Sequence, residues 1–123
     1  ERDGIFNGMM FSEMLAVKKK KMSELISEIE SKYGKYFYKR IDQHLSSNDL
    51  KSELIELTKG LKEVAGFKVV GIDTLDGCKL LFENGWLLVR ASGTETLLRI
   101  YTETTGKNKT EEILNDIKKK FKL

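Results

Sequence analysis

Hydrophobic residues repeat with the period of an amphipathic helix in four segments of the chain. In the first segment Ile5, Met9 and Met14 recur on one face, and in the second Ser23 is the predicted N-cap and Gly34 the predicted stop. The predicted helices cover about residues 4–16, 23–34, 49–65 and 108–121. The apolar face of the third consists of Leu50, Leu54, Leu57, Leu61 and Val64, and that of the fourth of Ile113, Leu114, Ile117 and Phe121.

Five other segments are rich in β-branched, aromatic and aliphatic residues, which favours strands. Asp76-Gly77 and Asn84-Gly85 are hairpin signals, and the second predicts a type I′ turn in which both residues have positive φ. The predicted strands are residues 36–44, 67–73, 79–83, 86–90 and 97–104. This order of elements predicts an α+β fold in which an antiparallel sheet is covered by helices on one face.

The composition is that of a single globular domain. The chain has 123 residues, of which 40% are hydrophobic and 33% charged. One cysteine excludes an internal disulfide framework and a multi-cysteine zinc site, and one histidine excludes a histidine-rich metal site. The net charge of +3 is too small to indicate nucleic-acid binding by itself. With no membrane-spanning apolar run and no signal peptide, the expected location is the cytoplasm.

The N-terminal region indicates a piece of a larger protein. The chain starts without methionine, and its first helix is so apolar that it needs a partner surface. The lysine run from Lys18 to Lys21 then predicts a solvated connection, with a phosphate or nucleic-acid patch as the alternative. We therefore interpret the sequence as a C-terminal part.

The segment from 90 to 96 has the residue types of an oxyanion site. Gly93 lets the backbone turn its N–H groups toward a bound anion, while Ser92 and Thr94 add hydroxyl donors. Arg90 adds a planar fork that matches two phosphate oxygens. An ordinary capped turn is the alternative, although a turn alone requires none of these side chains.

Glu95 does not suit this anion site, because its carboxylate repels a phosphate. Its side chain is therefore expected to point away and to pair with Arg90 or Arg99.

The run from Arg90 to Glu95, followed by the residues from Leu97 to Tyr101, closely resembles the signature of the α-D-phosphohexomutase superfamily. That superfamily includes phosphoglucomutase and phosphomannomutase. One departure is Thr96, where the family usually has a proline that stiffens the exit from the loop. Three further stretches are similar to the family, so that the resemblance spans the chain in order: residues 1–6, 33–40 and 71–77.

This resemblance implies a domain organisation and a binding site. Residues 1–17 would be the last helix of the third domain, residues 18–22 the hinge, and residues 23–123 the fourth, C-terminal domain. The fold would be a mostly antiparallel, four-stranded sheet with helices on one face, like the TATA-box-binding protein. The residues expected to bind the substrate phosphate are Arg90, Ser92, Gly93 and Thr94.

The resemblance also implies that the parent protein is an enzyme, of which this chain would be one part. The parent protein would interconvert hexose 1-phosphate and hexose 6-phosphate through a phosphoserine and a bisphosphorylated sugar, with Mg²⁺. The nucleophile and the metal ligands belong to other domains of the family, so this chain is expected to have no catalytic residue, no metal site and no activity alone. The expected partners are a phosphosugar and domains one to three of the same polypeptide, and neither nucleic acid nor a membrane.

Two alternatives to this function remain open. Within the superfamily, the parent could be a phosphoglucosamine mutase or a phosphopentomutase-like member. Outside it, the chain could be a lysine-rich module that binds nucleic acid or protein. Residues 36–40, with their aromatic and basic side chains, imitate an RNA-binding strand, but no companion motif accompanies them. Trp86 is expected as a core or sheet-face residue rather than as a sugar-stacking platform.

Other chemically active residue types have structural interpretations. Asp73, Asp76 and Glu83 lack the spacing of a metal loop and are interpreted as turn residues. His44 is expected at the surface. Cys78 is expected as a buried thiol.

Overall fold

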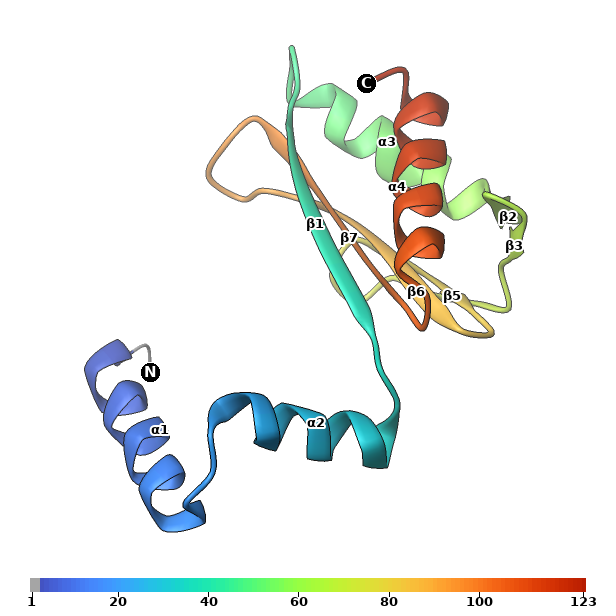
Figure 1. Cartoon of the computed structure of the whole chain (residues 1–123). Coiled ribbons are helices and arrows are strands. Elements are labelled where there is room, and N and C mark those ends of the chain that lie inside the picture. Colours follow the sequence, from blue (N-terminus) through green and yellow to red (C-terminus); the bar gives the residue numbers. More distant parts are fainter. Residues whose placement is uncertain (1–2) are drawn as a thin grey trace. The chain divides into compact units, whose positions relative to one another are not determined.

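The structure, a computed structural model, describes residues 3–123 and divides between Lys35 and Tyr36 into two compact units, each described by itself below (Figure 1). Glu1 and Arg2, which belong to a stretch resembling the phosphohexomutases, lie outside the described residues. Among residues 3–123 no helix is long and apolar enough to cross a membrane. The elements are α1 (Gly4–Lys18), α2 (Met22–Tyr33), β1 (Phe37–His44), α3 (Asp49–Gly60), β2 (Glu63–Val64), β3 (Phe67–Lys68), β4 (Gly71–Asp73), β5 (Cys78–Phe82), β6 (Gly85–Ala91), β7 (Leu97–Thr104) and α4 (Lys107–Phe121).

The two helices of the first unit begin and end at identifiable side chains. The Asp3 carboxylate accepts a hydrogen bond from the Phe6 amide at 2.9 Å, which caps α1. The prediction that Ser23 caps α2 is wrong, because the helix already begins at Met22. Glu24 explains the earlier start, since its carboxylate reaches back to accept from the Lys21 amide at 2.6 Å. The predicted stop at Gly34 is confirmed.

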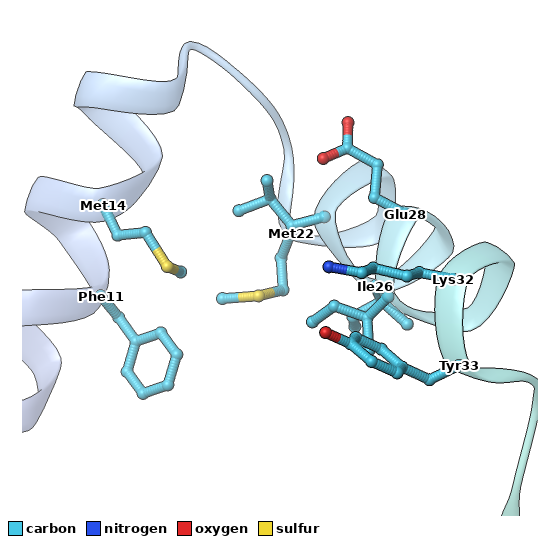
Figure 2. Close-up of a pocket in the computed structure, with 9 residues that line it drawn as sticks. Phe11, Met14, Met22, Ile26, Glu28, Lys32 and Tyr33 are labelled. Atoms are coloured by element: carbon cyan, nitrogen blue, oxygen red, sulfur yellow. The ribbon is translucent and has the colours of Figure 1, made fainter.

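The apolar side chains of the first unit are mostly exposed. Within α1, Ile5 is 82% exposed and Val17 72%, and no described residue of α1 or α2 is buried. Figure 2 shows an open apolar pocket of this unit, with Phe11 on α1 and Ile26 and Tyr33 on α2 among its lining side chains. The 19–21 connection between the helices is exposed, as the lysine run predicts.

The second unit confirms the predicted α+β class. Its main sheet has the strand order β1-β7-β6-β5-β4, and every neighbouring pair is antiparallel. Both α3 and α4 lie on one side of this sheet (Figure 1). The four-stranded sheet that the resemblance implies is wrong in its count, because β4, which lies within the strand predicted over 67–73, is a fifth, three-residue strand at the edge next to β5.

Side-chain alternation separates the two faces of the sheet. In β6, Leu87 and Val89 are fully buried, whereas Trp86, Leu88 and Arg90 alternate to the other face and are half-buried. The buried face forms one hydrophobic core with the helices. Its members include Leu54 of α3, Leu80 of β5, Leu98 and Ile100 of β7, and the four predicted residues Ile113, Leu114, Ile117 and Phe121 of α4.

Two predicted elements break where the chain forms a small separate hairpin. The helix predicted over 49–65 ends at Gly60, and the strand predicted over 67–73 divides into β3 and β4. The cause is the β2–β3 pair, whose tight turn places Ala65 at φ 51° and Gly66 at φ 81°. After it, the Val70 amide donates to the Leu81 carbonyl at 2.8 Å and returns the chain to the main sheet.

The hairpin predicted at Asn84-Gly85 is confirmed, but the type I′ turn is wrong. Phe82 pairs with Gly85, so the turn residues are Glu83 and Asn84, and neither has positive φ. Gly85 is needed for a different reason. A Cβ at this position would lie 2.3 Å from the Glu103 carbonyl oxygen of the neighbouring strand.

Candidate functional site

The turn over residues 92–96 joins β6 to β7 at one end of the main sheet. The Ser92 amide donates to the Leu97 carbonyl at 3.0 Å and closes the turn. Gly93 and Thr94 are exposed, and no atom lies within 4 Å of a Cβ built on Gly93. Among residues 3–123, no hydrogen-bond acceptor takes up the N–H groups of Gly93 and Thr94. The tip of the turn therefore offers free backbone donors to a ligand.

Ser92 supports this turn from inside. Its side chain is buried, and its Oγ accepts a hydrogen bond from the Glu95 amide at 3.3 Å. This bond folds the turn over the serine side chain, while the hydroxyl hydrogen of Ser92 stays available for donation. Thr94, in contrast, lies at the exposed tip.

Arg90 reaches the open face of the sheet directly before the turn. Its Nη1 forms an ion pair of 2.9 Å with Asp76 Oδ2, which comes from the β4–β5 connection. In the register of β6 and β7, Arg90 stands directly opposite Arg99. The Nε atoms of both arginines are buried without a hydrogen-bond partner. Each guanidinium is paired with a carboxylate, Arg90 with Asp76 and Arg99 with Glu95, and these carboxylates compensate the repulsion between the two like charges.

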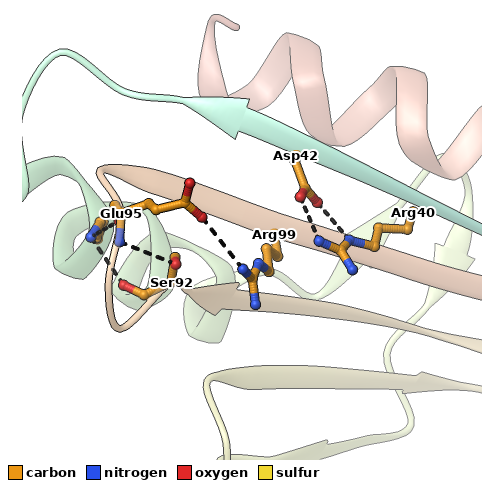
Figure 3. A network of polar contacts seen from close by, with 6 residues as sticks. Arg40, Asp42, Ser92, Glu95 and Arg99 are labelled. Atoms are coloured by element: carbon orange, nitrogen blue, oxygen red, sulfur yellow. Dashed lines mark hydrogen bonds and ion pairs between the residues drawn. The ribbon is translucent and has the colours of Figure 1, made fainter. Parts of the chain in front are cut away.

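Two further acidic residues, Glu95 and Asp42, are paired with arginines. Figure 3 shows Glu95 directed toward Arg99, at 3.7 Å between Oε2 and Nη2, which confirms Arg99 as one of its two expected partners. Further along the sheet, Arg40 Nε donates to Asp42 at 2.6 Å. The hydrogen bonds from Arg40, helped by the charges of Arg99 and His44, outweigh desolvation and hold the pKa of Asp42 below its usual value.

The remaining candidates have structural partners or lie apart. Cys78 is buried, and His44 is exposed at the end of β1, as predicted. Trp86 lies half-buried on the open sheet face, where the Lys79 ammonium sits 4.3 Å from its ring centroid. The Asp73 carboxylate accepts from the Leu75 amide within its own turn.

Two residues that hold the turn were missed in the sequence. The sequence pattern indicates only a turn residue at Asp76, yet Asp76 pairs with Arg90. Lys51, in the first turn of α3, donates to the carbonyl oxygens of Ser92 and Glu95. No local pattern identifies Lys51, because its acceptors lie more than forty positions further along the chain.

The turn and the side chains around it form a candidate anion site. It combines two guanidinium groups, free amides and hydroxyl groups, which suit an oxyanion such as phosphate. Among residues 3–123 there is no group of three or more acidic, histidine or cysteine side chains that could hold a metal ion.

Comparison with known proteins identifies the family of the chain. The sequence profile described as "Phosphoglucomutase/phosphomannomutase, C-terminal domain" matches residues 48–120. A phosphoglucomutase/phosphomannomutase of Thermococcus kodakarensis is 37% identical over 113 residues, which are 92% of this chain and 23% of the relative. A phosphoglucosamine mutase of Methanocaldococcus jannaschii is 33% identical over 112 residues, which are 91% of this chain and 23% of the relative.

A solved structure agrees with these relatives. The crystal structure of a Thermus thermophilus protein assigned as a phosphomannomutase superposes with a TM-score of 0.74 at 30% identity. The match covers 100% of this chain and 23% of that protein. The chain thus spans about a quarter of the length of the relatives it matches.

Proposed function

Because the chain belongs to the phosphoglucomutase/phosphomannomutase family, as its C-terminal domain, we propose that the turn between β6 and β7 binds the phosphate group of a hexose phosphate. Arg90 would grip two phosphate oxygens, the free N–H group of Gly93 would donate to the phosphate, and Ser92 and Thr94 would add hydroxyl donors. One observation carries the proposal: Arg90 and Arg99, whose Nε atoms have no hydrogen-bond partner, stand opposite each other beside a turn with free amide donors. An anion at this place would accept hydrogen bonds from the amides and from the guanidinium groups together.

The proposed parent protein is a phosphohexomutase that interconverts hexose 1-phosphate and hexose 6-phosphate. The phosphoserine and the Mg²⁺ that the resemblance implies are proposed to belong to other parts of the protein. The sugar is proposed to be glucose or mannose. Glucosamine is the alternative, since relatives of both names are similar to this chain.

The first unit would join this domain to the preceding one. We assign residues 1–17 to the end of the third domain, residues 18–22 to the hinge, and residues 23–123 to the C-terminal domain. The exposed apolar side chains of α1, such as Ile5 and Met9, support this assignment, because they require a covering surface. Replacing Met9 by Glu should leave the unfolding of the 123-residue chain unchanged and lower the thermal stability of the parent enzyme.

The phosphate proposal is tested by replacing Arg90 in the parent enzyme. Arg90→Ala should weaken glucose 1-phosphate binding by about 2–4 kcal/mol, because charge-assisted hydrogen bonds are lost. Arg90→Lys should also weaken it, since lysine keeps the charge but not the planar fork. Arg40→Ala is the matched control, because it removes a guanidinium from the same sheet face away from the turn. Equal affinities of wild type and Arg90→Ala would refute the proposal.

A further inference from the structure

Lys51 occupies a position that helix stability does not explain. It lies in the first turn of α3, where the positive end of the helix dipole disfavours a cation. Its ammonium nevertheless bridges to the turn between β6 and β7. Lys51 Nζ donates to the Ser92 carbonyl oxygen at 3.1 Å and also to the Glu95 carbonyl oxygen. One side chain thus holds both ends of the exposed tip.

These two bonds fix the direction of two amides. In a planar trans peptide the C=O and the following N–H point in opposite directions. The Ser92 carbonyl shares its peptide with the Gly93 N–H, and the Glu95 carbonyl shares its peptide with the Thr96 N–H. When Lys51 draws both carbonyls toward α3, both N–H groups are turned away from α3.

The direction matters because the helices and the arginines lie on opposite faces of the sheet. Val89 points into the helix-covered core, and Arg90, the next residue, points to the open face. Lys51 reaches the turn from the helix side. The Gly93 N–H, which has no acceptor among residues 3–123, is consequently aimed away from the helix side.

We infer that Lys51 is a positioning residue, which orients the turn amides toward the anion without touching it. This inference rests on the proposed phosphate-binding function of the turn. The positive charge of Lys51 lies behind the turn and stabilises the two carbonyl dipoles. Without this charge the carbonyl groups would reorient toward the anion side. Without Lys51 the peptide between Ser92 and Gly93 is free to flip, and a flipped peptide presents an oxygen to the phosphate.

The test is a phosphate titration of the ¹⁵N-labelled 123-residue chain, followed at the amide signals of the turn. Lys51→Met keeps the length of the side chain and removes the donor, so the dissociation constant for inorganic phosphate should rise about tenfold. The phosphate-induced shift of the Gly93 amide should be lost first. Lys51→Arg should restore both, because a guanidinium can donate to the same two carbonyls.

Lys59→Met is the matched control, since it removes the same charge from the same helix, where Lys59 pairs with Glu56. It should bind phosphate like the wild type. Arg90→Ala separates the two proposals. If phosphate shifts no turn amide in the wild type, or if Arg90→Ala binds equally well, the phosphate function itself is wrong.

If Arg90→Ala weakens binding while Lys51→Met does not differ from Lys59→Met, the positioning role is wrong and the phosphate function stands. Failure of Lys51→Arg to recover the Gly93 signal would also overturn the positioning role. Should Lys51→Met not fold, Lys51→Gln removes the charge with a smaller change in polarity and is judged by the same comparison.

Discussion

Replacing Asp116 by alanine tests how the β2–β3 hairpin is attached to the rest of the second unit. Asp116 lies on α4, and its Oδ2 accepts a hydrogen bond from the Ala65 amide at 2.7 Å. Ala65 is in the tight hairpin turn, with φ at 51°. The same carboxylate pairs with Lys120 at 2.9 Å, one helical turn away. Asp116→Ala removes both interactions and leaves the turn amide without its acceptor.

The expected loss follows from these two contacts. The hydrogen bond to a charged acceptor contributes about 2 kcal/mol, and the partly exposed ion pair about 0.5 kcal/mol. Alanine returns about 0.5–1 kcal/mol, because it is the better helix former and because an acid near a helix C-terminus is unfavourable. The net decrease in the free energy of unfolding should be about 1.5 kcal/mol. For a domain of this size that lowers the Tm by roughly 6–12 °C.

The pH dependence gives a second measurement of the same contacts. Burial acts to raise the pKa of Asp116, but the hydrogen bonds from Lys120 and the Ala65 amide, with the charge of Lys119, outweigh it. The pKa therefore lies below the ordinary value of 3.8. A carboxyl with a lowered folded pKa contributes stability that is complete above its unfolded pKa and disappears as the pH falls through its folded pKa. The difference between wild type and Asp116→Ala should be constant from pH 7 to about 5 and shrink below about 4.

Urea unfolding at several pH values measures both effects. Glu112→Ala is the matched control, because Glu112 is an exposed acid on the same helix. It should change the stability by less than about 0.5 kcal/mol. The reasoning fails if the two variants are equally stable, or if the loss in Asp116→Ala persists unchanged at low pH.

Two further predictions concern two glycine positions and the single cysteine. Gly77→Ala should lower the free energy of unfolding by about 3 kcal/mol, because φ is 90° and the new Cβ would lie 2.4 Å from the Val89 carbonyl oxygen. Gly93→Ala should change the free energy of unfolding by less than about 0.5 kcal/mol, because no atom lies within 4 Å of the new Cβ. Equal losses of stability for Gly77→Ala and Gly93→Ala in urea unfolding would contradict this difference. Cys78 should react with a thiol reagent only as fast as the chain unfolds, because it is fully buried and burial raises its pKa; rapid labelling of the native protein would disprove it.

Local periodicity correctly predicted those elements whose contacts in the fold follow the same pattern of apolar residues. The predicted helix at the C-terminus is confirmed almost to the residue, because its apolar residues all face one core. The predicted helix over 49–65 is too long for the opposite reason. Leu61 and Val64 continue the helical period, yet the chain there is extended and attached to α4 through Asp116. A contact made fifty residues away overrides the local pattern.

The candidate site also contains residues that could be predicted from the sequence and residues that could not. The residues from Arg90 to Thr94 could be selected in the sequence, because an anion site of this kind needs arginine, hydroxyl and glycine side by side. Their partners could not. Asp76 approaches Arg90 from a neighbouring hairpin, and Lys51 approaches the turn from a helix on the other face of the sheet.

The pairing of β1 with β7 has a consequence for how the second unit folds. β4 to β7 follow one another along the chain as antiparallel neighbours, whereas β1 pairs Phe37 with Thr104 and His44 with Leu97. Closing the segment between β1 and β7 costs entropy before any contact is formed, so we expect β1 to join a meander that has already assembled. A chain cut after β1 would leave the full edge of β7 unpaired, as a template for other chains. β1 therefore covers the edge of β7 and becomes the edge strand of the completed sheet in its place.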